Sequence, residues 1–410
     1  MFRVEITTDL EQLLESAEQW NALSEGIPFR ETSWLGPWWK HYGQGCRAVV
    51  VIARDEHNEI RGILPLYTQD KKSGHQILKI IGDGDAFSEY SSIICRQNDA
   101  VAIGDAMGKL LARETQWGLL QLEGIVEGDA AIVSLCRAMQ QQNCVVHADS
   151  RMHTWFRAQN ENWDEHLKQF GRSTRRKLRR WLEKVSQIDE LEKHTPESPA
   201  DAQQSLQKLI EMHQKRWNSV GEAGSYASPT FRNFISDCVA EFHSRGMLYL
   251  PSLRWSGDVV CSEMHFVGGN RRLYCYSTGF DIDRNELEPG RILNADTLHQ
   301  IYEQDWAGVD YLRGDEPYKK RMGATPTRVL RVLIAAPALV PKLRHAAWVK
   351  GFEVKQLMRR CTGRKPVELV DILNTPQPAS SEPTAPETST GAPLTVPVSL
   401  PTPTSSETVL

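Results

Sequence analysis

Two successive stretches of this chain follow a similar order of strands and helices, and this repetition limits the fold more than any other feature. Each stretch combines short apolar runs, typical of strands, with amphipathic helices. A chain of 410 residues also exceeds the length at which a single core usually stops growing. We therefore predict two α/β domains of similar plan, each a mixed sheet flanked by helices, at residues 1–158 and 159–340.

The predicted elements differ little between the two domains. In the first domain, strands are predicted at residues 2–6, 47–55, 60–68, 75–82, 90–95, 117–124 and 144–158, and helices at 9–23, around Trp34 to Trp39, at 100–113 and at 129–142. In the second, helices are predicted at 163–185, 199–220, 231–246 and 291–305, and strands at 247–255, 258–269, 271–280 and 308–314. We find no phosphate loop and no charged cluster at a strand end in the first domain, which we therefore predict to be degenerate.

The end of the chain differs from both domains. A basic amphipathic helix is predicted within residues 341–373, either packed on the protein or docked on a membrane surface or a partner. Residues 374–410 are rich in Pro, Ser and Thr and contain no aromatic residue and no Lys or Arg. Such a segment buries too little apolar surface to offset its ordering entropy, so we predict a disordered tail.

Composition and charge exclude several classes of protein. The chain has 40% hydrophobic and 24% charged residues and a net charge of -4, so it has no global attraction to DNA or to anionic membranes. Its eight cysteines are scattered singly, which is typical of a reduced cytoplasmic protein. We find no signal peptide, no transmembrane segment and no metal-binding or hydrolase motif, and we predict no metal.

The stretch YLRGDEPYKKRMG, from Tyr311 to Gly323, gathers charged and phenolic side chains directly after a predicted strand. Open α/β sheets commonly place ligands at the carboxyl ends of their strands. An Arg offers a planar fork to an anion, acids act as bases, and a Tyr can protonate a leaving group. The alternative is a salt-bridged surface turn, which contributes only about 0 to 1 kcal/mol. The candidate residues in this stretch are Arg313, Asp315, Glu316, Tyr318 and Lys319.

Polar side chains alternate along two predicted strands. Glu263 and His265 lie two residues apart and therefore project from one face, and Tyr274 and Tyr276 do the same on the next strand. Polar groups at alternate positions indicate either a face that lines a cavity or a half-solvated face. Buried Glu or His side chains can have pKa values suited to removing a proton from a nucleophile.

Two features suit an anion. The helix that follows Gly290 presents unpaired backbone N–H groups at its first turn, where Arg291 adds a charge and Asn294 follows one turn later. Six of the nine residues from Arg172 to Arg180, with Arg176 among them, are basic. This basic helix fits phosphates of a cofactor, a nucleotide sugar or RNA, or is simply a solvated face.

The sequence between Trp163 and Ala324 resembles the two-domain acyltransferases of the GNAT superfamily. The resemblance rests on LYCYSTGFD, ELEPGRILNADTLHQIYEQ and GVDYLRGDEPYKKRMGA, with a weaker match in PFRETSWLGPWWKHYG. It is nearest to the CelD-type proteins of cellulose and exopolysaccharide biosynthesis, and more distant from the FemAB-type aminoacyltransferases. In this superfamily the pyrophosphate of acetyl-CoA docks on a [RQ]-x-x-G-x-[GA] loop, of which this chain keeps only Gly290.

The resemblance implies acetyl transfer from acetyl-CoA to an amine or hydroxyl of a sugar or polysaccharide precursor. On this hypothesis Glu263, His265, Asp315 and Tyr318 are catalytic; Gly290, Arg291 and Asn294 bind the donor. The expected substrate-binding residues are Tyr274, Tyr276, Arg313, Glu316, Lys319 and Arg176. One alternative is a FemAB-like enzyme that uses aminoacyl-tRNA, the only case in which we expect tRNA as a partner. Another is a noncatalytic accessory module of a polysaccharide synthase.

Overall fold

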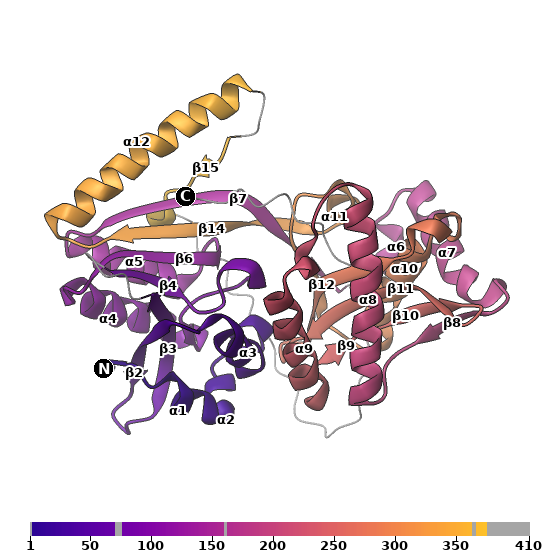
Figure 1. Ribbon diagram of the computed structural model, residues 1–410, viewed down its shortest axis with the longest axis horizontal. Coiled ribbons are helices and arrows are strands. Elements are labelled where there is room, and N and C mark those ends of the chain that lie inside the picture. Colours follow the sequence, from indigo (N-terminus) through magenta and orange to yellow (C-terminus); the bar gives the residue numbers. More distant parts are fainter. Residues whose placement is uncertain (1, 70–75, 160–161, 363–365, 375–410) are drawn as a thin grey trace. The chain divides into compact units, whose positions relative to one another are not determined.

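The computed structural model describes residues 2–69, 76–159, 162–362 and 366–374 (Figure 1). These residues form two compact units, one of residues 2–152 and 328–374 and one of residues 153–327. Both are mixed α/β structures, as the sequence predicts. Most of the predicted disordered tail, residues 375–410, lies outside the described residues.

The first unit contains most of the strands that the N-terminal sequence predicts and one strand from much later in the chain. Its strands are β1 (Arg3–Thr7), β2 (Cys46–Arg54), β3 (Ile60–Gln69), β4 (Gln76–Ile80), β5 (Ile94–Cys95), β6 (Trp117–Val126), the first part of β7 (Val145–Ala158), β14 (Thr325–Ala335) and β15 (Glu368–Leu369). Its α-helices are α1 (Leu10–Glu15), α2 (Ala17–Asn21), α3 (Thr32–Tyr42), α4 (Ala100–Arg113), α5 (Ala130–Gln141) and α12 (Leu339–Cys361).

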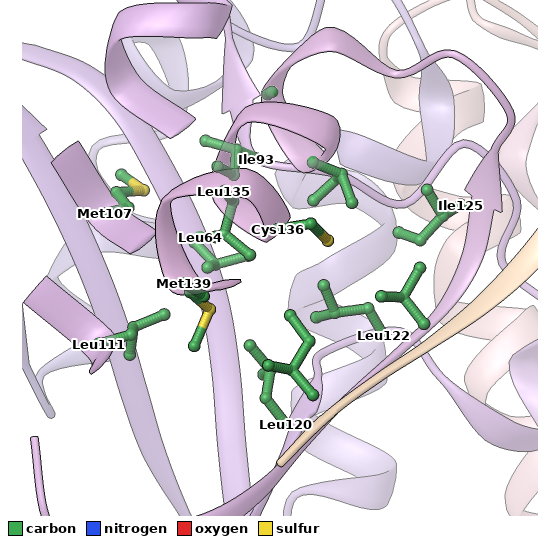
Figure 2. Close-up of a cluster of buried hydrophobic side chains, with 14 of the residues drawn as sticks. Leu64, Ile93, Met107, Leu111, Leu120, Leu122, Ile125, Leu135, Cys136 and Met139 are labelled. Atoms are coloured by element: carbon green, nitrogen blue, oxygen red, sulfur yellow. The ribbon is translucent and has the colours of Figure 1, made fainter. Parts of the chain in front are cut away.

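The sheet of the first unit has the order β1-β2-β3-β4-β6-β14-β7, in which β4 and β6 run parallel. Helices α4 and α5 pack closely against each other, because Gly104 and Gly108 let the α4 backbone approach the Ala131 and Leu135 carbonyls of α5. Figure 2 shows the core beside them, in which side chains of β3, β6, α4 and α5 meet. The alternation of apolar residues in these strands and helices was sufficient to predict this layer.

The second unit follows the predicted plan with additional short elements. Its strands are the last part of β7, β8 (Leu191–His194), β9 (Leu248–Tyr249), β10 (Ser252–Trp255), β11 (Asp258–Val267), β12 (Arg272–Phe280) and β13 (Gly308–Arg313). Its α-helices are α6 (Trp163–Lys168), α7 (Arg172–Gln187), α8 (Pro199–Ser219), α9 (Pro229–Ser244), α10 (Pro289–Glu303) and α11 (Pro317–Arg321).

The sheet of the second unit has the order β7-β13-β12-β11-β10-β8, and only β12 and β13 are a parallel pair among those whose register the structure describes. Helix α8 packs directly on one face, since a side chain at Gly279 of β12 would meet the Leu209 carbonyl of α8. Helix α10 contacts β11 and β12 and packs against α7. The alternate residues of β11 and β12 therefore point either to α8 and α9 or to α10.

Some elements differ from the predicted ones for local reasons. The helix predicted at 163–185 is two helices, because the chain turns at Phe170 and α7 begins only after Gly171. The strand predicted at 247–255 is interrupted at Pro251, which has no N–H for a ladder. Strand β8, the short helix α11 and strand β14 were not predicted.

Candidate active site

The candidate site lies where two parallel strands of the second unit stop pairing. Strands β12 and β13 pair as far as Tyr274 and Asp310, although both strands continue beyond that pair. Just after this point Leu312 has a φ of 51°, which few residues other than Gly adopt. The Asp310 carboxylate accepts a hydrogen bond from the Leu312 N–H at 2.9 Å and so holds this turn. The end of the ladder is the position at which open sheets bind ligands.

Two polar side chains of β11 lie near this position with no exposed surface. Glu263 and His265 are both 0% exposed and lie on the strand face that is turned to α10. Within the described part of the chain, no hydrogen bond of ordinary geometry reaches either carboxylate oxygen of Glu263 or either ring nitrogen of His265. The nearby Thr297 hydroxyl donates instead to the Leu293 carbonyl at 2.7 Å. Buried polar groups without partners are rare and call for an explanation such as a ligand.

Burial sets the protonation of this pair in opposite directions. It raises the pKa of Glu263 well above its ordinary value; the charge of Asp296 on α10 raises it further, and the Thr297 hydroxyl partly offsets both. It lowers the pKa of His265 well below its ordinary value, so the imidazole stays neutral. A carboxyl with a raised pKa and a neutral imidazole are the forms that take part in proton transfer near neutral pH.

Two tyrosines complete this buried group. The rings of Tyr311 on β13 and Tyr318 on α11 meet edge to face, with their centroids 5.9 Å apart. Both hydroxyls are buried and have no hydrogen-bond partner among the residues described. Burial raises the pKa of both phenols, and the charges of Cys275 and Glu263 raise them further. Both tyrosines therefore remain protonated and are suited to donate a proton.

We call Glu263, His265, Tyr311 and Tyr318 the buried polar cluster. Three of its members come from the sequence prediction, and Tyr311 was missed as a site residue because it reads as the end of an apolar strand. The sequence signal that could have identified Tyr311 is its position as the first residue of the charged stretch.

The charged stretch after β13 has two kinds of residue. Lys319 has 0% exposure and donates to the carbonyls of Leu312, Arg313 and Gly314 at 2.7 to 3.2 Å. Its ammonium also lies 3.1 Å from the Glu316 carboxylate. Lys319 therefore stabilises the loop conformation. Its ammonium already donates to three carbonyls, so no N–H is left to bind a substrate.

The other charged residues of the stretch are more exposed. Asp315 is exposed, and its carboxylate lies 2.9 Å from Nδ1 of His153 on β7. Arg313 is half-buried. The structure thus places Asp315 at the surface with a histidine partner, apart from the fully buried Glu263.

A β-bulge separates the two tyrosines of β12, yet both lie beside Phe266, whose ring centroid is 5.5 Å from that of Tyr276. The register between β11 and β12 shifts at Tyr276, which leaves this residue half-buried in a β-bulge. Tyr274 lies opposite Phe266, on the face turned away from Glu263, and its hydroxyl accepts a hydrogen bond from Asn270 at 2.8 Å. A bulge depends on the partner strand and is invisible in the sequence of one strand.

At the N-terminus of α10 the structure places a carboxylate that the sequence reasoning missed. Glu288, the N-cap residue, accepts hydrogen bonds from Arg180 at 3.0 Å, Trp181 at 3.2 Å and Lys184 at 3.3 Å, and also pairs with Arg291. Burial opposes its ionisation, but these hydrogen bonds and charges lower its pKa to about 2. Of the groups predicted at this helix end, Arg291 contacts this internal carboxylate, and the N–H groups of Arg291 and Ile292 donate to the Glu288 backbone carbonyl.

The remaining predicted residues lie near this helix end or on the surface. Gly290 is in the first turn of α10, and a side chain there would meet only Phe280 at 3.8 Å, so no close approach requires glycine. Asn294 is buried one turn later. Arg176 is exposed on α7, a helix whose other basic residues Arg180 and Lys184 contact Glu288.

The second unit also has an open pocket of about 440 Å³ on its α8 side. Charged groups of both signs line it, including Lys208 and Glu211 of α8 and Arg254, Asp258 and Arg284 beside the β10–β11 turn. Because α8 covers the face opposite α10, this pocket does not lead to Glu263.

The first unit contains a buried charged group that the sequence reasoning did not find. Arg30 donates to the Tyr90 carbonyl at 2.6 Å and pairs with Asp129 at 3.3 Å, and Glu31 and Glu89 are almost completely buried. The available signals were an isolated Glu in FRETSW and another in FSEYSS.

Comparisons with known proteins bear on the second unit most directly. Residues 172–320 match a family model described as an acetyltransferase (GNAT) domain. The chain therefore contains a GNAT-like acetyltransferase domain. This match covers the buried polar cluster, α10 and the charged stretch as far as Lys320. No curated protein matches the sequence.

Solved structures show a likeness in fold over most of the chain. The crystal structure of FemX matches with a TM-score of 0.57 at 11% identity, over 80% of this chain and 98% of that one. A conserved protein of unknown function from Bacteroides thetaiotaomicron matches with a TM-score of 0.49 at 12% identity, over 82% of this chain and 100% of that one. A tandem GNAT protein from the clavulanic acid pathway has a TM-score of 0.42 at 12% identity, over 83% and 100%. At such identities the likeness concerns the fold alone.

Two kinds of feature are absent from the described residues. No described helix is both long enough and apolar enough to cross a bilayer. No group of three or more His, Cys, Asp or Glu side chains within the described ranges is arranged to hold a metal ion.

Proposed function

We propose that this protein is an acyltransferase that moves an acetyl group from acetyl-CoA to an amine or hydroxyl of a saccharide precursor. The GNAT-like domain at residues 172–320 supports acyl transfer. The observation that carries the assignment to this site is the buried polar cluster, whose unpartnered Glu263 lies beside two protonated tyrosines where the β12–β13 ladder ends. The saccharide acceptor follows from the resemblance to CelD-type proteins and is the finer part of the proposal.

In the proposed reaction the cluster moves two protons. Glu263 must first lose its own proton; its raised pKa then makes the carboxylate a strong base, which takes the proton of the acceptor amine or hydroxyl. The acceptor nitrogen or oxygen then bonds to the thioester carbon. The carbon–sulfur bond breaks, and Tyr318 donates its proton to the departing thiolate. His265, neutral and on the same face as Glu263, accepts a hydrogen bond from the acceptor. Tyr318 regains its proton from Glu263 before the next cycle, so the protons balance.

Access to this cluster requires a movement of the α11 segment. Glu263 has no exposed surface, and Tyr318 of α11 packs on Tyr311 of the adjacent strand. We propose that the acceptor enters past this segment, where Arg313, Asp315 and Glu316 meet it first. The bonds from Lys319 to three carbonyls keep the loop intact as it moves.

We propose that the donor binds at the N-terminus of α10. Arg180, Lys184 and Arg291 already surround an anion there, the Glu288 carboxylate. The pyrophosphate of acetyl-CoA would compete with that carboxylate for the same positive groups. Gly290 and Asn294 lie within the first turns of this helix and complete the donor site.

The experiment that tests the function is acetyl transfer by the full chain from acetyl-CoA to a panel of amino sugars and saccharides. The Glu263→Gln variant should lower kcat by roughly 10² to 10⁴-fold, the usual contribution of a general base, with the Kd for acetyl-CoA unchanged. The exposed Glu192→Gln on β8 serves as the control. Full activity of Glu263→Gln contradicts the proposed mechanism.

The alternative enzyme is a FemAB-like aminoacyltransferase, which the likeness in fold to FemX favours. The exposed basic side chains of α7 suit the phosphates of tRNA. A thermal melt separates the two proposals, because a ligand that binds only the folded state raises Tm. Stabilisation by acetyl-CoA and not by tRNA supports the first proposal, and the reverse result supports the second.

A noncatalytic accessory module is the remaining alternative. It predicts that Glu263→Ala, Arg291→Ala and Asp315→Ala each leave the cellular phenotype unchanged while the protein stays folded. Loss of the phenotype in all three contradicts a purely accessory role.

A further inference from the structure

Helix α12 exposes an unusual share of the large apolar side chains on the protein. Eleven large hydrophobic residues are exposed in the described part of the chain, and six of them are on this one helix. Their exposed fractions range from 47% to 72%. The six residues are Leu339, Val340, Leu343, Val354, Leu357 and Met358. Single exposed apolar residues are ordinary, but a concentration on one element indicates an interaction surface.

The helix is anchored to the first unit by its other side. His345 and Phe352 are buried, and both rings lie near His147 of β7, at 5.9 and 5.6 Å between centroids. Trp348 stacks on Phe352 and also covers the Arg331 guanidinium of β14. The side of α12 that carries His345, Trp348 and Phe352 therefore faces β7 and β14.

The exposed apolar residues form one stripe along the helix, in two groups separated by residues 344–353. At about 100° per residue, Leu339, Leu343, Val354 and Leu357 fall within roughly 60° of one another. Val340 and Met358 extend the stripe on one side. The stripe is directed away from the buried His345 and Phe352 side.

Basic residues border this stripe on both sides. By the same geometry Lys342 and Arg360 lie along one border, and Arg344 and Lys355 along the other. Lys350 lies within the stripe itself, at the middle of the helix. The helix has six basic residues and one acid, Glu353, which pairs with Lys350 at 3.0 Å. Its charge of +5 contrasts with the net charge of -4 for the whole chain.

We propose that the exposed face of α12 docks on an anionic phospholipid surface, with the helix lying parallel to the bilayer. An apolar stripe between two basic borders matches a helix at the boundary of headgroups and acyl chains. The apolar side chains enter the acyl region while the Lys and Arg side chains extend outward to the phosphates. The charge of the helix makes a neutral partner surface a poorer match.

The test is flotation of the full chain with vesicles of phosphatidylcholine, alone or mixed with phosphatidylglycerol. We expect the protein to float with the mixed vesicles, to remain behind with phosphatidylcholine alone, and to be released by salt. Leu343→Asp and Leu357→Asp should each abolish flotation without lowering Tm, because both side chains are exposed in the folded protein. Arg360→Gln should weaken binding about fivefold, the effect of about 1 kcal/mol per basic residue near the surface.

A matched control is Val220→Asp, which places the same charge at an exposed apolar position of the second unit. It should float like the unchanged protein. Three outcomes overturn the proposal: no flotation on the mixed vesicles, equal flotation on phosphatidylcholine alone, or unchanged flotation of Leu343→Asp and Leu357→Asp. Sedimentation velocity without lipid can give a fourth outcome that overturns it. If the protein is a dimer that Leu343→Asp dissociates, the exposed face of α12 binds a second copy of the chain.

Discussion

The two units bury charged side chains in different ways. In the first unit Arg30 is bonded to both the Tyr90 carbonyl and Asp129, and Asp129 also caps α5 by accepting from the Ile132 N–H at 3.0 Å. In the second unit Glu263 is more deeply buried than Arg30 and has no hydrogen bond of ordinary geometry from any described residue. Paired groups hold a structure together, whereas an unpartnered buried carboxyl destabilises the fold that contains it. The difference indicates that the first unit uses its buried charges for stability and the second keeps one for a ligand.

The largest effect should come from breaking the pair in the first unit. Asp129→Asn keeps the capping oxygen of α5 but leaves Arg30 buried without its counter-charge, and should lower the free energy of unfolding by about 3 kcal/mol. Urea denaturation measures it. Asp105→Asn, which breaks the exposed Lys109 pair on α4, is the control and should change stability by about 0.5 kcal/mol at most. Equal effects of the two substitutions would mean that the Arg30 pair is not a stabilising contact.

Lys319 tests whether the second unit also contains paired charges of a structural kind. Lys319→Met removes a buried ammonium that satisfies three loop carbonyls, and should lower the free energy of unfolding by about 2 kcal/mol. The neighbouring Lys320 is exposed, so Lys320→Met should leave the free energy of unfolding unchanged. If Lys319→Met retains full stability but loses acceptor binding, the residue binds substrate as the sequence suggested.

Replacing Glu263 should raise the free energy of unfolding, whereas the two substitutions above lower it. Because its pKa is raised in the folded protein, the folded state keeps its proton while the unfolded state loses it above the ordinary value of 4.5. The unchanged protein therefore loses stability as pH rises from 4.5 toward the raised pKa, and Glu263→Gln does not. We expect the variant to be more stable by about 1 to 2 kcal/mol at alkaline pH, and equal to the unchanged protein below 4.5.

Thermal melts across this pH range measure how the stability curves of the variant and the unchanged protein separate above pH 4.5. Glu192→Gln, at an exposed position, should follow the unchanged protein throughout. A Glu263→Gln variant that is less stable at every pH would show that the carboxylate has a structural partner.

The smallest effect concerns Glu288, whose pKa is lowered to about 2 against the opposing effect of burial, by hydrogen bonds from Trp181, Arg291 and Lys184. Its contribution to stability is present above the ordinary pKa and is lost as pH falls from 4.5 toward 2.

Glu288→Gln should release the positive groups and tighten acetyl-CoA binding several-fold in isothermal titration, with Glu303→Gln at the far end of α10 as the control. Weaker binding in Glu288→Gln would place the donor elsewhere.

The sequence predicted much of the second unit because its signals are local. Strand β11 alternates apolar and polar residues, which placed Glu263 and His265 on one face, and the Pro289–Gly290 pair marked the start of α10. The β-bulge at Tyr276 and the pairing of β12 with β13 depend on neighbouring strands, so no single segment reveals them. The proposed roles of the site residues stay predictions.

Other features could not be predicted because their partners lie far away in the chain. Glu288 reads as a loop residue before Pro289, and its role depends on Arg180 and Lys184, more than 100 residues earlier. The pairing of Arg30 with Asp129 joins two segments that have no common motif. Charge networks of this kind become visible only when the fold brings their members together.

The position of strand β14 shows that the second unit is inserted in the first. The chain leaves the first unit after residue 152, forms the second unit and then returns to the first. After residue 327 the chain returns and supplies a strand that pairs with β6 from Val329 to Ala335. A fragment that stops near residue 158 would therefore lack a strand from the middle of its own sheet and expose the edge of β6 to aggregation. To express the first unit alone, residues 2–152 must be joined to residues 328–374. A truncation at any position between 153 and 327 leaves both units incomplete.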